Sequence, residues 1–172
     1  MNWVYVVGGL VVVLGFSVFF GAPYVPSRRR DLRRMFDELY PLTGQDVVID
    51  VGSGDGVILR EASRRGAKAI GYEISPVLVV ISKWLSRHDK KVTIYLSNFW
   101  LADFPNDTTV VYAFSVQRDV KKLENKMQTQ ANRLNKPLAL VCYASPLRNK
   151  KPEREFEAYH LYMFRPLQGG KA

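Results

Sequence analysis

Residues 46–56 read DVVIDVGSGDG, an apolar, β-branched run followed by glycine at every second position. The apolar run predicts a buried strand, and the pattern from Val57 onward predicts a helix. Glycines in such a connection let the backbone turn sharply and let a ligand come close to it. Free amides at the start of the helix would face that ligand, so this stretch predicts a strand–turn–helix unit with a ligand at the turn.

The alternation of strand and helix continues to the end of the chain. After the strand at 46–51, further strands are expected at 67–73, 92–96, 108–114, 138–143 and 158–164, and helices at 57–65, 76–87 and 119–134. Alternation of this kind is typical of a parallel sheet with helices on both faces. The sequence therefore predicts an α/β fold, with a Rossmann-like, mostly parallel sheet of about six strands in one domain of ordinary size.

An acidic residue, Glu73, stands at the end of the second expected strand, seventeen residues past Gly56. A carboxylate there can accept both ribose hydroxyls of a nucleoside. Dinucleotide enzymes need their third glycine one position later, where this chain has Val57, and their anionic pyrophosphate needs no acid at Asp50. S-adenosylmethionine carries an ammonium and a sulfonium, so Asp50 and Asp55 favour it. The alternatives are a dinucleotide-binding domain and a purely structural glycine turn.

These residues resemble the class I methyltransferases, which use S-adenosylmethionine. Residues 50–56 look like their motif I, and Gly71-Tyr72-Glu73 looks like the acidic motif after their second strand. The resemblance implies an adenine contact after the third strand, where Asn98 can equally cap a helix and Phe99 can stack on adenine or merely pack. The cofactor-binding residues that follow from it are Asp50, Gly52, Ser53, Gly54, Asp55, Gly56, Glu73, Ile74, Asn98 and Phe99.

A narrower resemblance covers roughly residues 1–165. The chain is similar to a family of membrane-anchored protein-lysine methyltransferases with one N-terminal hydrophobic segment and a Pro-containing linker. Mitochondrial members of that family modify the ATP synthase c-subunit and the adenine nucleotide translocase. The chain departs from the family at Asn98, where the family usually has Asp-Leu-Trp. The similarity lies in residues 48–56, in residues 71–76 with Leu78, Val79 and Ser82, in Phe99 and Trp100, in residues 114–116 and in residues 123–126.

The resemblance implies a methyltransferase that acts on a lysine side chain of a membrane protein. Two alternatives remain open: a small or lipid-like acceptor, and a non-enzymatic cofactor-binding module or assembly factor. The acceptor should enter at the carboxyl ends of the first and fourth strands. There the chain has residues 113–116 in place of the Asn/Asp-Pro-Pro-Tyr motif, which argues against the nucleic-acid N-methyltransferases bearing that motif. Phe114 and Ser115 either line the acceptor channel or pack, and the sequence identifies no catalytic base.

Residues 3–22 contain no charged side chain. Twenty helical residues rise about 30 Å, the thickness of a bilayer's hydrocarbon core, so the segment predicts a membrane helix. A cleaved signal peptide, the main alternative, would want a basic region before the apolar stretch. The positive-inside rule places the arginines that follow, and the catalytic domain, on the cytoplasmic (or matrix-equivalent) side, against anionic lipid head groups. These arginines are Arg28, Arg29, Arg30, Arg33 and Arg34.

The expected organisation is a membrane anchor at 1–22, a linker and basic amphipathic helix at 23–41, the methyltransferase domain at 42–166 and a tail at 167–172. The formal net charge of +9 suggests an anionic partner, and the membrane surface accounts for part of it, so no nucleic acid is expected. Cys142 lies in an apolar run and is expected in the core. His88 and His160 have no cysteine or acidic cluster at metal-ligand spacing, so no metal is expected.

Overall fold

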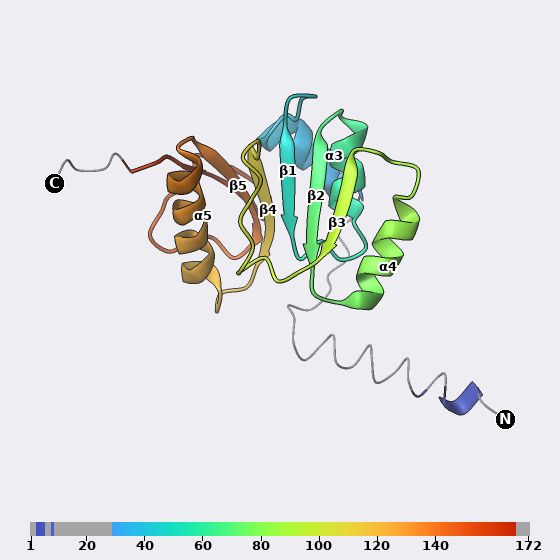
Figure 1. Cartoon of the computed structure of the whole chain (residues 1–172). Coiled ribbons are helices and arrows are strands. Elements are labelled where there is room, and N and C mark those ends of the chain that lie inside the picture. Colours follow the sequence, from blue (N-terminus) through green and yellow to red (C-terminus); the bar gives the residue numbers. More distant parts are fainter. Residues whose placement is uncertain (1–2, 6–7, 9–28, 168–172) are drawn as a thin grey trace.

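The computed structural model describes residues 3–5, 8 and 29–167 (Figure 1). Within these residues the sheet has seven strands in the order β3-β2-β1-β4-β5-β7-β6. The strands are β1 (Val47–Val51), β2 (Lys68–Glu73), β3 (Val92–Leu96), β4 (Val110–Ser115), β5 (Leu138–Ala144), β6 (Arg154–Phe156) and β7 (Tyr159–Phe164). The first five are parallel, whereas β7 runs antiparallel to β5 and β6 runs antiparallel to β7. The helices are α2 (Arg29–Arg34), the π-helical turn η1 (Met35–Leu39), α3 (Val57–Arg64), α4 (Pro76–Leu85) and α5 (Val120–Leu134).

The predicted α/β, Rossmann-like sheet is confirmed, but the expected number of six strands is wrong. The strand that the sequence does not reveal is β6, which has three residues and exposes both Arg154 and Glu155. A strand this short and polar shows no apolar alternation from which to predict it. It pairs with β7 across a tight connection, in which Glu157 takes a left-handed φ of 53°.

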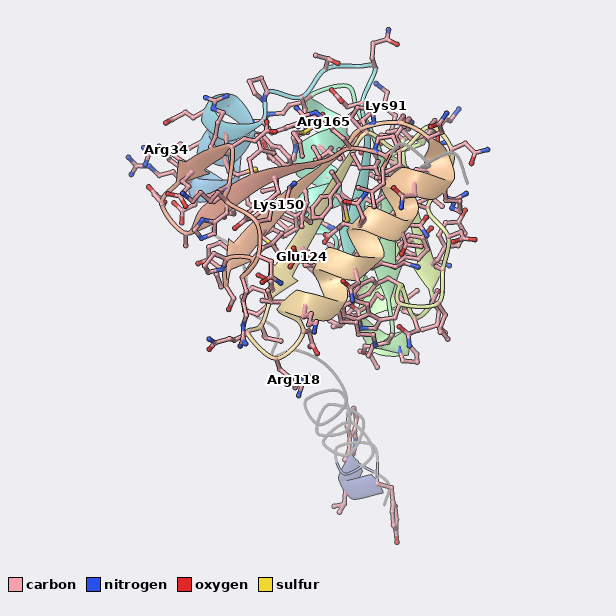
Figure 2. The ribbon with its side chains drawn as sticks, turned by 90° about the vertical axis from the view of Figure 1, so that its left-hand side faces the viewer. Arg34, Lys91, Arg118, Glu124, Lys150 and Arg165 are labelled. Atoms are coloured by element: carbon pink, nitrogen blue, oxygen red, sulfur yellow. The ribbon has the colours of Figure 1, made fainter. Side chains whose placement is uncertain are left out.

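Apolar side chains pack on both faces of the sheet, as expected for parallel strands covered by helices. On one face α2, η1, α3 and α4 pack around residues such as Val48 and Tyr112. On the other face α5 packs around residues such as Ile49 and Val111 (Figure 2). Because side chains alternate along a strand, Asp50 points to the same face as Val48. The acidic residue near the tip of β1 therefore lies on the α3 side of the sheet.

The predicted helix before the sheet is present as α2 continued by η1. Most of the predicted membrane segment at 3–22 lies outside the described residues, and so does the first part of the predicted linker. No helix in the described part of the chain has the length and apolar character that a bilayer span requires. The side chains that α2 and η1 bury in the core are Leu32, Met35, Phe36 and Leu39.

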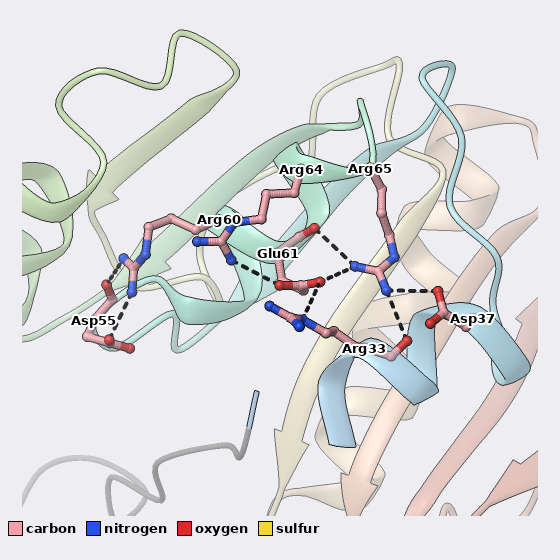
Figure 3. A network of polar contacts seen from close by, with 7 residues as sticks. All are labelled: Arg33, Asp37, Asp55, Arg60, Glu61, Arg64 and Arg65. Carbon is pink, nitrogen blue, oxygen red and sulfur yellow. Dashed lines mark hydrogen bonds and ion pairs between the residues drawn. The ribbon is translucent and has the colours of Figure 1, made fainter. Parts of the chain in front are cut away.

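A buried carboxylate ties α2 and η1 to α3 (Figure 3). Glu61 is 3% exposed and forms ion pairs with Arg33 at 3.8 Å, with Arg64 at 3.0 Å and with Arg65. Arg65 also pairs with Asp37 at 2.8 Å and donates a hydrogen bond to the Arg33 carbonyl. An unpaired charge is costly to bury, so Glu61 depends on these arginines as much as they position the two helices.

The substitution Glu61→Gln tests this cluster, because it keeps the side chain's shape and removes its charge. We expect the free energy of unfolding to fall by about 1–3 kcal/mol, a modest value because Arg33 and Arg64 are open to water. The matched control is Glu38→Gln, which removes an exposed partner of Arg34 and should cost less than about 1 kcal/mol. Urea unfolding of the full chain measures both, and equal losses would contradict the role of Glu61.

Candidate functional site

The glycine-rich loop connects the end of β1 to the start of α3. Gly52, Gly54 and Gly56 all adopt left-handed φ values, of 87°, 54° and 79°, which residues other than glycine rarely adopt. A Cβ added to Gly56 would lie 2.3 Å from Ser82 Oγ of α4, so this glycine lets two helices approach each other. A Cβ added to Gly52 would meet nothing within 4 Å. Gly52 therefore leaves its backbone open to a ligand.

Glu73, at the carboxyl end of β2, holds this loop in place. Glu73 is 7% exposed, and one of its carboxylate oxygens accepts a hydrogen bond from Gly54 N at 2.8 Å. The other oxygen accepts from Ile74 N at 2.9 Å and from Ser75 N at 2.8 Å. A carboxylate offers about four acceptor positions, so three amide donors leave roughly one for a ligand hydroxyl. Glu73, the residue predicted to bind the ribose, thus also joins the loop to the turn before α4.

Asp50 is the most enclosed acid of the site, with 2% of its surface exposed. Burial raises the pKa of this carboxyl well above its usual range, and the nearby carboxylates of Glu73 and Asp55 raise it further. None of the ion pairs among the described residues neutralises Asp50. The tip of β1 is therefore a position where a cationic ligand would relieve an unfavourable accumulation of negative charge.

The sequence suggested that Asp55 faces a cationic cofactor, but in the structure its carboxylate contacts an arginine. It pairs with Arg60 at 3.0 Å, as Figure 3 shows, and it also accepts a hydrogen bond from Val57 N at 3.3 Å. Its charge is partly neutralised by the protein and fixes the start of α3. Of the two acids that favoured a cationic cofactor, the structure leaves Asp50 as the one without a basic partner among the described ion pairs.

Ser53 of the loop packs closely against Gly71 of β2. Ser53 is buried, and its hydroxyl has no hydrogen-bond partner within the described part of the chain. A Cβ added to Gly71 of β2 would lie 2.5 Å from that hydroxyl and 2.6 Å from Leu59 Cδ1. The glycine in Gly71-Tyr72-Glu73 is thus required by the packing of the loop and α3 against β2.

The residues predicted to surround adenine gather where β2 and β3 end. The amide of Ser97 donates to the Glu73 carbonyl at 2.9 Å, which brings Asn98 and Phe99 to the same edge as Ile74. Asn98 Oδ1 accepts from Trp100 N at 3.1 Å, so this side chain caps the turn that follows β3, as in the alternative interpretation. Phe99 is half-buried against Trp100, with ring centroids 4.2 Å apart.

The predicted acceptor residues lie at the end of β4. Ser115 is buried, and its hydroxyl donates to the Ser145 carbonyl at 2.6 Å, which holds β4 to the end of β5. Phe114 is half-buried and faces Tyr143, with ring centroids 5.8 Å apart. Tyr143 in turn packs on Tyr159 at 4.7 Å. The lining role of Phe114 and Ser115 stays a prediction.

Together with Tyr112, these rings form a row that the sequence does not predict. The strand registers pair Asp50 with Tyr112, Phe114 with Tyr143, and Tyr143 with Tyr159, so all of these side chains share one face of the sheet. We call Tyr112, Phe114, Tyr143 and Tyr159 the aromatic row. It extends from the buried acid across the carboxyl ends of β4 and β5. Only the antiparallel register of β7 brings Tyr159 into it, and no local pattern encodes that register.

The arginines predicted to contact lipid head groups have mixed environments. Arg28 lies outside the described residues, and Arg29 and Arg30 begin α2. Arg33 pairs with Glu61, as described above. Arg34 pairs with Glu38 at 3.3 Å and with Glu157 at 2.9 Å. Among the described arginines of this group, Arg33 and Arg34 are therefore engaged by carboxylates of the protein itself.

Residues 50–154 match the family model described as the ANTKMT methyltransferase domain. The chain belongs to this methyltransferase family. The match begins at Asp50 and includes the loop, Glu73 and the end of β4, so the residues of the candidate site lie within it. The resemblance to class I methyltransferases that the loop and Glu73 indicate is confirmed.

Similar proteins extend this assignment. The chain is 32% identical over 137 residues to the ATP synthase c-subunit lysine N-methyltransferase of Xenopus laevis, and the match covers 78% of this chain and 58% of that relative. It is 30% identical to a protein-lysine N-methyltransferase of Saccharolobus islandicus (strain REY15A), over 63% of this chain and 69% of that relative. The chain thus spans little more than half the length of the Xenopus laevis protein.

A solved structure shows the same fold. The RNA methyltransferase from Salinibacter ruber, in complex with S-adenosyl-L-homocysteine, superposes with a TM-score of 0.72 at 25% sequence identity. The superposition covers 86% of this chain and 98% of that chain. Its substrate class differs from that of the lysine methyltransferases, so the fold alone does not specify the acceptor.

The packing of Gly56 against Ser82 yields a prediction about the methyltransferase loop. Gly52→Ala and Gly56→Ala both place a side chain at a left-handed φ, which should cost about 1–2 kcal/mol of stability each. Gly56→Ala should cost more, because its Cβ also collides with Ser82 Oγ. Adding Ser82→Ala should bring Gly56→Ala back to the level of Gly52→Ala. Thermal unfolding of the wild type and these three variants checks this. If Ser82→Ala does not recover the stability of Gly56→Ala, the collision is ruled out.

Proposed function

We propose that this chain uses S-adenosylmethionine to methylate a lysine side chain of a membrane protein. The observation that carries the proposal is the buried carboxyl of Asp50, which has no basic partner among the described ion pairs and lies near the open backbone of Gly52. Membership of the methyltransferase family supports methyl transfer. The names of the relatives support lysine as the acceptor.

The residues at the ends of β1, β2 and β3 suit S-adenosylmethionine. Asp50 would balance the positive charge of its ammonium and sulfonium groups, and the remaining acceptor position of Glu73 would take a ribose hydroxyl. Ile74 is 46% exposed at the same edge and, with Phe99, offers apolar surface to the adenine. A solved relative that holds S-adenosyl-L-homocysteine supports this cofactor.

The aromatic row suits a lysine acceptor. Bound S-adenosylmethionine supplies an activated methyl group, so the protein has mainly to align the acceptor amine and keep water away from it. The faces of the Phe114 and Tyr143 rings can attract an ammonium group. Removal of that ammonium from water lowers its pKa and favours the neutral amine, the form that attacks the methyl group.

The membrane part of the proposal rests on the chain's N-terminal composition and on its relatives. Residues 3–22 contain no charge, and arginines follow from Arg28 onward. These features favour a single-pass anchor with the catalytic domain on the cytoplasmic (or matrix-equivalent) side. Several relatives are named for the c-subunit of ATP synthase, and we propose that the acceptor here is likewise a membrane protein.

The Asp50→Asn substitution separates stability from cofactor binding. A carboxyl whose pKa is raised in the folded state destabilises that state as pH rises from about 4, its unfolded value, through the raised pKa. The amide has no such cost, so without cofactor Asp50→Asn should be more stable than the wild type at neutral pH. It should also bind S-adenosylmethionine more weakly, by about 1.5–3 kcal/mol, or about ten- to a hundredfold.

Thermal unfolding across pH and titration calorimetry measure these two effects. The matched control is Asp55→Asn on the same loop, which breaks the ion pair with Arg60 and should lower stability. If Asp50→Asn leaves the affinity for S-adenosylmethionine unchanged, or if the wild type prefers a dinucleotide, the cofactor assignment fails.

Methyl labelling identifies the acceptor. The full chain, incubated with membranes and methyl-labelled S-adenosylmethionine, should transfer label to protein, and acid hydrolysis should release it as methyl-lysine. Asp50→Asn serves as the folded control and should transfer little. Label in the lipid extract would instead favour a lipid-like acceptor, and cofactor binding without transfer would favour a non-enzymatic module. Label in nucleic acid or mainly in soluble protein would refute the proposed acceptor.

A further inference from the structure

The helix α4 has its large apolar side chains on the outside. Its buried residues are Val79 and Ser82, and Ser86, the residue after its end, is also buried. The outward-facing positions recur at intervals of three and four residues, as one stripe of a helix requires. We call this stripe the outer face of α4, and it consists of Val77, Val80, Ile81, Trp84 and Leu85.

The outer face is large and strongly exposed. Val80 is 67% exposed and Trp84 is 62% exposed. Pro76, Val77, Val80 and Ile81 line a shallow depression of about 310 Å³ with no polar residue among them. A single exposed apolar residue is ordinary on a protein surface, whereas a continuous apolar stripe on one helix marks a contact with something else.

The charges that α4 and the next three residues carry are positive. Lys83 and Arg87 are exposed beside it, and residues 76–88 contain no carboxylate. The Arg87 guanidinium lies over the Trp84 ring, 4.8 Å from its centroid, and donates to the Trp84 carbonyl at 2.9 Å. An apolar stripe with Trp, flanked by Lys and Arg, is the composition of helices that lie in the interface of an anionic bilayer.

We infer that the outer face of α4 docks on an anionic lipid bilayer. Its apolar side chains enter the boundary between head groups and acyl chains, while Lys83 and Arg87 contact lipid phosphates. A second copy of the chain is a poorer occupant, because a symmetric contact would bring these same cations together. This docking surface lies on α4, apart from the predicted segment at 3–22 and from the arginines of α2.

The position of α4 gives the docking a consequence for the site. The helix begins at Pro76, three residues after Glu73, and flanks the edge strand β3 (Figure 1). The carboxyl ends of the strands, where the loop and the aromatic row lie, are therefore at the same end of the molecule as the start of α4. A bilayer against α4 holds that edge near membrane-embedded acceptors.

A reporter on α4 tests this in the full chain. Cys142 is buried, and burial raises the pKa of its thiol to about 11, so a thiol-reactive fluorophore will label an introduced cysteine selectively. We place one fluorophore at Val80→Cys and, as the matched control, one at Thr129→Cys, which is exposed on α5 across the sheet. Vesicles contain phosphatidylcholine with or without phosphatidylglycerol, and brominated acyl chains serve as quenchers.

In phosphatidylglycerol vesicles we expect strong quenching at position 80, at a depth of about 5–10 Å below the head groups, and none at position 129. Lys83→Glu should reduce the quenching at position 80, whereas Lys121→Glu on α5 should not. High salt should act in the same direction as Lys83→Glu, because it screens the attraction to lipid.

Three outcomes would overturn the inference. The first is equal quenching at positions 80 and 129. The second is protection of position 80 from aqueous iodide without lipid, in a manner that depends on protein concentration, since a second copy would then occupy the face. The third is the same protection at every concentration, since another segment of the chain would then cover it. The reporter does not depend on methyl transfer, so failure of the proposed activity leaves this test intact.

Discussion

The carboxylate of Glu73 accepts hydrogen bonds from three backbone amides, and much of the site depends on this arrangement. One amide belongs to Gly54 in the loop after β1, and the other two belong to Ile74 and Ser75 before α4. A single side chain thus joins the β1–α3 loop to the β2–α4 turn, and Glu73 bonds Gly54, which lies nineteen residues before it in the sequence. Without it, three amide donors would lose their acceptor, and the two buried ones, Gly54 N and Ser75 N, would each cost about 1–3 kcal/mol. The loop that carries Gly52 would then keep only the bonds from Gly52 N and Ser53 N to the Tyr72 carbonyl as its attachments to β2.

This arrangement concentrates negative charge. Asp50 and Glu73 lie near the carboxyl ends of the neighbouring strands β1 and β2, and both Glu73 and Asp55 lie close enough to raise the pKa of Asp50. The protein offsets part of that charge through Arg60, which pairs with Asp55. What remains unbalanced at Asp50 is unfavourable for the free protein and favourable for a cationic ligand. The same burial that makes the site costly to fold therefore makes it selective.

Local patterns predicted most of the sheet, because β1 to β5 are apolar runs punctuated by glycine, proline and polar turns. They failed at β6, where Arg154 and Glu155 carry no apolar signal. The loop and Glu73 were also recognisable, since their spacing is a local property of the chain. The ion pair between Asp55 and Arg60 was not recognisable, because it depends on side-chain rotamers. The position of Tyr159 beside Tyr143 was not recognisable either, because it depends on the register of an antiparallel strand.

The cluster around Glu61 has a mechanical meaning. It joins α2 and η1 to α3, and the same short segment buries four side chains in the core. The segment from Arg29 to Leu39 is therefore fixed to the rest of the domain by both ion pairs and buried apolar contacts. A displacement of Arg29 would have to carry α3 with it or break these contacts.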